Sequence, residues 1–328
     1  MARVLSGIQP TGDIHLGNYL GAVRNWVDDQ HTQDCYFCVV DLHAITVPRD
    51  PAGLRAKTLE TTLVLVAAGL DPEVCTLFVQ SHVHQHSELS WILECVASMG
   101  ELRRMTQFKE KAKDGEESAR VALFTYPVLQ AADILLYDAD HVPVGEDQRQ
   151  HLELCRDVAL RFNHRYGQTF VVPEAVLPKV GARIMDLQKP TAKMSKSAES
   201  PQGTVLVLDD PRVIERKFKR AVTDTGTDVA FDPEKKPGVA NLLAVLAAAT
   251  GRRPDEVAEG YSQYGPLKAD ASEAVIELLR PVRTRYEELA ADPEAVRATL
   301  RQGAEKAEAV AGATLARARE AIGLLSRG

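Results

Sequence analysis

The first two-thirds of the chain alternates short apolar runs with segments of helical periodicity, and this alternation limits the possible folds more than any other feature. Strand-like apolar runs occur at residues 3–8, 35–45, 75–80 and 140–145, and each precedes a segment whose apolar residues recur at helical spacing. Strands that alternate with helices predict an α/β fold, with a parallel sheet covered by helices on both faces. Such sheets bind their ligands beyond the carboxyl ends of the strands.

The last third of the chain follows a helical pattern. Residues 271–292 carry one apolar stripe at alternating spacings of four and three, formed by Val275, Leu279, Val282, Tyr286 and Leu289. Pro281 lies inside this stripe, where a proline is expected to kink or end a helix. We therefore predict an α/β domain over residues 1–204 and an α-helical domain over residues 205–328.

Composition and charge exclude several classes of protein. The formal net charge of −7 argues against a protein coated in DNA or RNA over its whole surface, but it leaves room for a local basic patch. No apolar run reaches membrane-spanning length, and the first ten residues lack the features of a signal peptide. The five cysteines are odd in number and irregular in spacing, which favours a reducing, cytoplasmic compartment over a disulfide framework.

Two clusters of possible metal ligands occur near strand ends. Cys35 and Cys38 form a CxxC pair without a second pair or a histidine pair, so structural thiols are favoured over a metal or redox site. His82, His84 and His86 stand at every second position, and in a strand they would share one face. Because they run from a strand end into a helix with no nearby cysteine or carboxylate cluster, we predict no metal site.

The stretch SGIQPTGDIHLGNYLG follows the first predicted strand, where phosphate-binding loops occur. Gly7 and Gly12 have the spacing of a P-loop, but Asp13 stands where such a loop needs lysine, and no GxGxxG is present. A P-loop or dinucleotide enzyme is therefore disfavoured. His15 and Asn18 lie at a helix N-terminus, where they either cap the helix or help to bind an anion; taken alone, capping is favoured.

The stretch KPTAKMSKSAES, residues 189–200, is too polar for a core. It is either a solvated loop or a clamp for a polyphosphate. Lys193 and Lys196 would suit the second role, because each ammonium is a flexible point charge with three donors. Pro190 near the start of this stretch and Gly203 shortly after its end fit a loop that hinges over a nucleotide.

The HIGH-like tetrapeptide at residues 15–18 and the intact KMSKS at residues 193–197 together resemble the class I aminoacyl-tRNA synthetases. Further stretches resemble the bacterial tryptophanyl-tRNA synthetases over nearly the whole chain: SGIQPTG, RMTQFKEK, AADILLY, VPVGEDQRQHLEL, PKVGARIM and AVTD. The resemblance implies a Rossmann-type catalytic domain at residues 1–204, with a helical insertion around residues 85–125 at a dimer interface. It also implies an α-helical anticodon-binding domain at residues 205–328, a homodimer, and the use of ATP with Mg²⁺.

The resemblance also assigns roles to individual residues. The residues implied in ATP binding are Gln9, Pro10, Thr11, Gly17, Asn18, Gly145, Glu146, Asp147, Ile184, Lys193, Met194, Ser195, Lys196 and Ser197. Among these, Ile184 falls where the family packs an apolar residue on adenine. The residues expected to act in catalysis are His15, Asn18, Lys193 and Lys196.

Asp133 matches the carboxylate that receives the indole N–H of tryptophan in this family. It lies in a helical stretch that is otherwise almost entirely apolar, where a carboxylate is costly unless it is paired. Indole offers one donor and no acceptor, so an anionic acceptor suits it; the alternative is a core carboxylate held by a backbone N–H or an arginine. The other residues predicted to bind tryptophan are Leu5, Gly7, His43, Tyr126, Gln130, Val142, Val144 and Gln148. For His43 a plain structural role is an equal alternative.

The helix that carries Asp133 also resembles the pocket helix of tyrosyl-tRNA synthetases. Tyr126, Leu129, Gln130 and Asp133 share one helix face, and many tryptophanyl enzymes carry methionine where Gln130 stands. Gln130 could instead hold the α-amino group. Leu5 favours tryptophan, because tyrosyl enzymes usually place a tyrosine there. A non-catalytic paralogue is a further alternative, which the retention of both KMSKS lysines disfavours.

The predicted function is therefore tryptophan–tRNA ligation, with L-tryptophan and tRNA-Trp as partners and neither DNA nor a membrane involved. Two basic stretches could contact tRNA phosphates or simply be solvated: residues 103–113 and residues 216–220.

Overall fold

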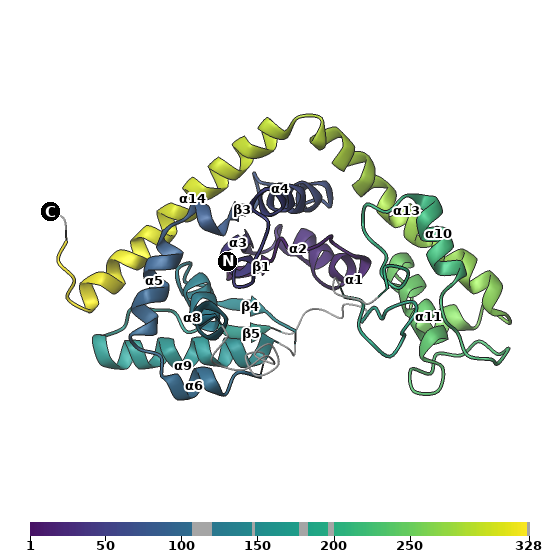
Figure 1. Ribbon diagram of the computed structural model, residues 1–328, viewed down its shortest axis with the longest axis horizontal. Coiled ribbons are helices and arrows are strands. Elements are labelled where there is room, and N and C mark those ends of the chain that lie inside the picture. Colours follow the sequence, from purple (N-terminus) through teal and green to yellow (C-terminus); the bar gives the residue numbers. More distant parts are fainter. Residues whose placement is uncertain (107–119, 146–147, 177–182, 196–199, 327–328) are drawn as a thin grey trace.

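The computed structural model describes residues 1–106, 120–145, 148–176, 183–195 and 200–326. Its centre is a five-stranded parallel sheet with the order β3-β2-β1-β4-β5 (Figure 1). The strands are β1 (Arg3–Ile8), β2 (Asp34–Val39), β3 (Thr76–Val79), β4 (His141–Pro143) and β5 (Glu174–Val176). The predicted α/β fold is confirmed, and the first strand has the predicted bounds.

Alternation along the strands divides the buried side chains between two hydrophobic clusters. Val4 and Cys35 belong to one cluster, and the next residues along each strand, Leu5 and Tyr36, belong to the other. Cys38 lies three residues from Cys35 and therefore on the opposite face of the sheet. The two thiols cannot share a ligand, so the CxxC pair is structural.

The helices of the α/β part connect successive strands. They are α1 (Leu16–Asn18), a π-helical turn η1 (Tyr19–Val23), α2 (Arg24–Asp29), α3 (Asp41–Ala44), α4 (Pro51–Ala67), the short 3₁₀ turn η2 (Gln80–His82), α5 (Gln85–Glu94), α6 (Met99–Arg103), α8 (Val121–Leu135) and α9 (Arg149–Tyr166). The predicted second strand was too long, because the chain turns into α3 where the sequence remains apolar. The fifth strand was not predicted, because β5 is exposed and carries no alternating pattern.

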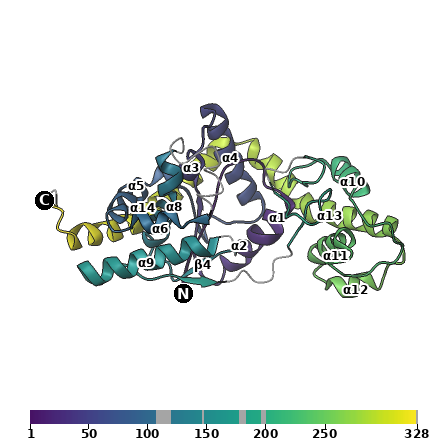
Figure 2. The same ribbon diagram turned by 60° about the horizontal axis from the view of Figure 1, so that its bottom comes forward.

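A second group of helices follows the KMSKS stretch. It consists of α10 (Pro211–Lys219), α11 (Pro237–Thr250), α12 (Pro254–Ala258) and α13 (Tyr264–Ala290), and it forms a separate lobe at the right of Figures 1 and 2. The predicted stripe of α13 is buried at Val275, Leu279 and Val282. Pro281 does not end this helix, contrary to one of the two expectations for it, because the packed stripe continues on both sides of it.

The last helix, α14 (Pro293–Ala321), leaves that lobe and returns to the sheet (Figure 1). Gly303 lies so close to the edge strand β3, whose residues are all buried, that a methyl group there would overlap the carbonyl oxygen of Leu77. Ala307 and Ala311 are buried in the same hydrophobic cluster as Phe78. Residues 205–328 are helical as predicted, but they do not pack as one unit, because α14 completes the core of the α/β part. None of the helices in the described residues is long and apolar enough to cross a lipid bilayer.

Candidate active site

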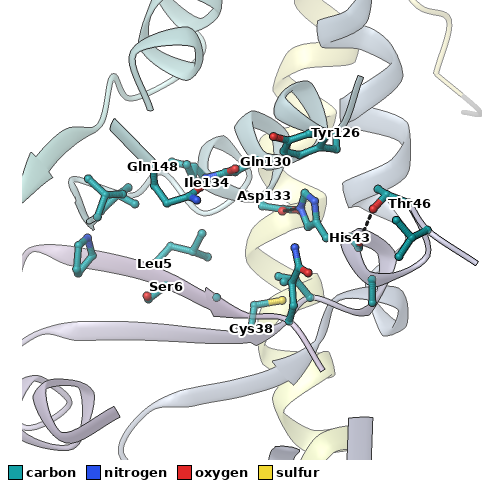
Figure 3. Close-up of a pocket in the computed structure, with 18 of the residues that line it drawn as sticks. Leu5, Ser6, Cys38, His43, Thr46, Tyr126, Gln130, Asp133, Ile134 and Gln148 are labelled. Atoms are coloured by element: carbon teal, nitrogen blue, oxygen red, sulfur yellow. Dashed lines mark hydrogen bonds and ion pairs between the residues drawn. The ribbon is translucent and has the colours of Figure 1, made fainter. Parts of the chain in front are cut away.

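A cavity of about 510 Å³ opens at the carboxyl end of the sheet, between β1, β2, β4 and helix α8 (Figure 3). This is the place where parallel α/β sheets bind ligands, and the volume suits a small organic molecule. All residues predicted to bind the amino acid line it: Leu5, Gly7, His43, Tyr126, Gln130, Asp133, Val142, Val144 and Gln148. Gln9, predicted for ATP, lies at the same cavity.

Several lining residues were not predicted. They are Ser6, Cys38, Val40, Ala44, Thr46, Val47, Arg49, Ile134 and Pro143. Most of them are neighbours of predicted residues at strand ends, so the position of the strand ends was the available signal. Burial raises the pKa of the Cys38 thiol well above its ordinary value, so this group lines the cavity as a neutral, weakly polar surface.

Asp133 is buried, with 4% of its surface exposed, and three donors surround its carboxylate. Nε2 of His43 donates to Oδ2 at 2.7 Å. Oδ1 accepts from Nε2 of Gln80 at 2.7 Å and from Nδ1 of His86 at 2.6 Å. Burial by itself would raise the pKa of Asp133, but the two histidines outweigh it and hold the pKa well below its ordinary range. The group is therefore a carboxylate anion.

The two alternatives for Asp133 are thus both partly correct. The acid is satisfied within the protein, although by two imidazoles and an amide instead of a backbone N–H or an arginine. It also lines the cavity. A carboxylate has about four lone-pair sites, and three donors occupy three of them, two on Oδ1 and one on Oδ2. One site on Oδ2 is left for a ligand.

Helix α8 turns three of the four residues of its predicted face to the cavity (Figure 3). Tyr126, Gln130 and Asp133 project from it toward β1, while Leu129 lines a neighbouring hollow that shares Tyr126 and Thr46 with the cavity. The hydroxyl of Tyr126 is 2.8 Å from Nε2 of the buried His151. Its ring meets the His43 ring edge-on at 6.3 Å between centroids. His43 therefore contacts both Asp133 and the Tyr126 ring, and it lines the cavity.

The HIGH-like segment forms the entry to the first helix. Nδ1 of His15 accepts the backbone N–H of Asn18 at 3.2 Å, and Oδ1 of Asn18 accepts the backbone N–H of His15 at 3.3 Å. This is a reciprocal capping box, as expected from these residues alone. A side chain at Gly17 would press against the His15 ring and approach Ile184 at 3.7 Å. Pro10 and Thr11 precede this segment in the loop after β1.

The base of the KMSKS stretch lies beside the HIGH-like segment. The backbone N–H of Leu16 donates to the carbonyl of Val205 at 2.8 Å, and that of Val207 donates to Ile14 at 2.9 Å. Met194 is buried, whereas the neighbouring Lys193 is exposed, and Lys193 pairs with Met185 through an antiparallel bridge. The fold therefore brings the described residues next to the KMSKS motif together with the HIGH-like segment after β1.

Part of the predicted nucleotide site falls outside the described residues. The residues outside the described part are Glu146, Asp147, Lys196 and Ser197. Gly145 and Ser195 are described. Asp13, which occupies the position of a P-loop lysine, forms an ion pair with Lys57 of α4. Its charge is thus balanced by the protein.

The three alternating histidines do not share a face. His82 and His84 are exposed, and His86 is fully buried against Asp133. In the described part of the chain, no group of three or more His, Cys, Asp or Glu side chains is arranged to hold a metal ion.

Comparison with known proteins identifies the family to which this fold and sequence belong. A family model described as "tRNA synthetases class I (W and Y)" matches residues 1–280. The chain is 58% identical over 329 residues to the tryptophan–tRNA ligase 1 of Streptomyces coelicolor, with 99% of this chain and 98% of the relative covered. It is 54% identical over 329 residues to the tryptophan–tRNA ligase of Caldanaerobacter subterraneus, with 100% of both chains covered.

Solved structures of the same kind superpose on the whole chain. The tryptophanyl-tRNA synthetase of Mycoplasma pneumoniae matches with a TM-score of 0.92 and 36% identity, over 100% of this chain and 99% of that one. The enzyme of Campylobacter jejuni, complexed with ADP and tryptophan, matches with a TM-score of 0.84 and 34% identity, over 98% and 100%. The chain therefore belongs to the class I tRNA synthetases for tryptophan and tyrosine, and it is an aminoacyl-tRNA synthetase.

Proposed function

We infer that the protein activates L-tryptophan with ATP, giving tryptophanyl-adenylate and pyrophosphate, and then transfers the acyl group to the 3′ end of tRNA-Trp. The observation that carries the choice of amino acid is the Asp133 carboxylate, which lines the cavity together with the apolar side chains of Leu5, Val142 and Val144 and keeps one acceptor site on Oδ2. The curated relatives at 51–58% identity, all tryptophan–tRNA ligases, support the same choice.

The cavity suits an indole ring. Leu5, Val142 and Val144 supply apolar surface for its faces, and Asp133 supplies an acceptor for its single N–H. Phenylalanine would leave that acceptor facing a C–H edge, which a site built for a hydrogen bond rejects strongly. In this proposal Gln130, Gln148 and Tyr126 lie within reach of the polar end of the amino acid.

Adenylate formation needs positioning and charge neutralisation more than a protein nucleophile. The tryptophan carboxylate attacks the α-phosphorus of ATP, the bond to the bridging oxygen breaks, and that electron pair leaves with pyrophosphate. We propose that Lys193, which is exposed, meets that charge, and we assign Lys196 the same task from the sequence. The capping box of His15 and Asn18 holds the helix N-terminus at which the phosphates would lie.

Mg²⁺ fits this site as a cation that arrives with the nucleotide. The described residues offer no carboxylate cage for it, and Mg²⁺ commonly keeps several waters and binds through substrate phosphates. When bound, it would neutralise charge on the phosphates.

For tRNA binding we propose the basic helix α10 as a contact with phosphates. Arg216, Lys219 and Arg220 are exposed on or just after it. Lys217 of the same stretch is buried and paired with Asp209 at 2.6 Å, so it is not available to a phosphate. Of the second basic stretch, Arg103 and Arg104 are exposed, and the lysines at positions 109, 111 and 113 lie outside the described residues.

We further propose a homodimer, formed through the surface around helix α5. Ile45, Trp91, Met99 and Val121 are exposed by 51%, 68%, 60% and 77%, and the apolar hollow beside the cavity is lined by Ile45 and Trp91. Large apolar groups exposed together are typical of an interface. The predicted insertion at residues 85–125 thus supplies much of this surface.

A cytoplasmic location fits the free cysteines of the chain and the need for tRNA.

Amino-acid-dependent ATP–pyrophosphate exchange tests the function, with tryptophan, tyrosine and phenylalanine compared in parallel. We expect exchange with tryptophan alone, followed by aminoacylation of tRNA-Trp. Exchange driven by tyrosine would mean that the cavity selects the phenol. Absence of exchange with all three amino acids would favour a non-catalytic paralogue.

A further inference from the structure

Behind Asp133, on the side away from the cavity, lies a buried pair formed by His86 of α5 and Tyr137, two residues after α8. Nδ1 of His86 is 2.6 Å from Oδ1 of Asp133, and Nε2 of His86 is 2.8 Å from the hydroxyl oxygen of Tyr137. Both side chains are fully buried, and neither lines the cavity. They therefore touch the acid without being able to touch a ligand.

The protons of this pair have one arrangement that satisfies every group. The carboxylate of Asp133 can only accept, so Nδ1 of His86 donates to it. Burial raises the pKa of Tyr137 far above its ordinary value, so the phenol keeps its proton and can donate it to Nε2 of His86. The Tyr137 hydroxyl thus selects the imidazole tautomer that carries its proton on the side of Asp133.

Packing and the last helix fix the position of the pair. The Tyr137 ring packs on Tyr36 and Phe78, with centroids 5.0 and 5.3 Å apart. Side chains of helix α14 contact residues on both sides of the pair: Oε1 of Glu308 accepts from Nε2 of Gln85 at 3.3 Å, next to His86 in the chain. Two further α14 contacts flank the pair, from Arg319 to Glu88 and from Arg317 to Asp138.

The other donors show why the pair matters for recognition. Oδ1 of Asp133 receives both donors that lie outside the cavity lining, Gln80 and His86, whereas Oδ2 receives only His43, which lines the cavity. With both lone pairs of Oδ1 engaged, the carboxylate cannot rotate without breaking a buried hydrogen bond, and a misplaced acceptor loses most of its value. The open acceptor site thus stays on Oδ2, at the cavity.

We propose that His86, backed by Tyr137, is a positioning residue for amino-acid recognition: it anchors Oδ1 of Asp133 from behind and so directs Oδ2 at the indole N–H. The inference rests on the function proposed above. It predicts that replacing His86 weakens one contact of the substrate, the hydrogen bond from the indole N–H to Oδ2 of Asp133.

A substrate analogue that lacks the indole N–H measures the contribution of this hydrogen bond. In 3-benzothienyl-L-alanine a sulfur atom replaces the indole N–H, so the ring has nearly the same shape but no donor. We measure kcat/KM for tryptophan and for this analogue in ATP–pyrophosphate exchange. For the unaltered protein we expect a ratio of about 10 to 100 in favour of tryptophan, the usual value of a hydrogen bond to a charged group.

In His86→Leu the ratio should fall at least fivefold, while KM for ATP stays within twofold. His84→Leu is the matched control, because His84 lies two residues away with an exposed side chain, and it should keep the ratio. In Tyr137→Phe, which keeps the ring and removes only the hydroxyl, a fall of about threefold is expected. His86→Asn keeps a donor close to the position of Nδ1 and should recover part of the ratio.

The outcomes separate the two levels of the inference. If the unaltered protein shows no tryptophan-dependent exchange, the proposed function fails, and the role of His86 fails with it. If exchange is normal but His86→Leu and Tyr137→Phe keep the full ratio, only the role of His86 is wrong. Should His86→Leu not fold by circular dichroism, Tyr137→Phe and His86→Asn decide the question, since both preserve size or polarity.

Discussion

The two halves of the active site are built in different ways. On the amino-acid side, packed strands and helices surround the cavity, and the acid that would select the substrate is 4% exposed and held by three donors. On the phosphate side, Lys193 is exposed on a short irregular segment that is joined to the rest by backbone hydrogen bonds and a buried methionine.

This difference matches the two tasks. Selecting one flat ring among similar amino acids requires a buried acceptor in a fixed position, because an unmet hydrogen bond is costly only where water is excluded. Neutralising a departing diphosphate requires charges that strengthen their contacts as negative charge accumulates. We therefore expect substitutions in the first half to change amino-acid affinity, and substitutions in the second half to change the rate.

The largest effect is expected for Asp133→Asn. The amide has the shape of the carboxylate, but it loses the anionic acceptor and directs an N–H₂ group at donors from Gln80, His43 and His86. We expect kcat/KM for tryptophan in pyrophosphate exchange to fall by about 1,000-fold, with KM for ATP nearly unchanged. Asp140→Asn, at an exposed residue directly before β4, is the control.

Lys217→Met tests what supports the phosphate side. Lys217 is 7% exposed, and its ammonium donates to Asp209 at 2.6 Å and to the carbonyl of Thr204 at 2.7 Å, in the segment after KMSKS. Breaking a buried pair leaves an uncompensated charge, so the free energy of unfolding should fall by about 3 kcal/mol in chemical denaturation. The same change at Lys219, exposed on the same helix, should stay within about 0.5 kcal/mol.

Lys193→Ala should slow adenylate formation by about 100-fold in single-turnover kinetics, because an ammonium that meets the leaving pyrophosphate is lost. Lys196→Ala should behave alike. Tryptophan affinity should stay within twofold in both variants. A loss of affinity as large as the loss of rate would remove the distinction between the two halves.

These outcomes bear on how much of the molecule the sequence predicts. The parallel sheet, the helical last third and the nine residues predicted to bind the amino acid followed from periodicity, strand ends and the family resemblance, whereas the other residues that line the cavity did not. The contact of His86 with Asp133 did not, because the three alternating histidines were considered only as metal ligands and no metal site was predicted. Only the fold shows that His86 turns inward toward an acid 47 residues away while its neighbours face solvent.

The packing partner of the last helix could not be predicted from the sequence either. Its buried face is made of small residues such as Gly303, Ala307 and Ala311, and such a stripe does not reveal which partner it covers. The partner is the edge strand β3, whose close approach requires the absence of a side chain at position 303. Likewise β5 is too short and exposed to have a strand pattern.

Gly303→Ala tests the packing of helix α14 against strand β3. The added methyl group would overlap the Leu77 carbonyl, so the free energy of unfolding should fall by about 2 kcal/mol. Gly312→Ala on the same helix has no close neighbour except the end of the Gln85 side chain at 3.7 Å, and it should stabilise the protein by about 0.5 to 1 kcal/mol. Equal effects at both positions would contradict the packing described for α14.

The smallest effect concerns Glu101 of α6, which pairs with Arg161 of α9. The Arg161 hydrogen bond lowers the pKa of Glu101 from its ordinary value of 4.5 to about 2. A carboxyl group whose pKa is lower in the folded state stabilises the fold above its ordinary pKa, and this contribution is lost as the pH falls from 4.5 toward 2. Since Arg161 is 40% exposed, we expect about 1 kcal/mol at most. Glu101→Gln should remove this part of the acid sensitivity in denaturation curves between pH 5 and pH 2, whereas Glu153→Gln, on an exposed pair, should not.

The most direct test of the division between the two halves is calorimetric titration of tryptophan, without ATP, into the unaltered protein, Asp133→Asn and Lys193→Ala. We predict that Lys193→Ala binds tryptophan with a Kd within twofold of the unaltered protein, and that Asp133→Asn binds it at least 100-fold more weakly. Normal binding by Asp133→Asn, or equal weakening in both variants, would contradict the assignment of selectivity to the buried acid.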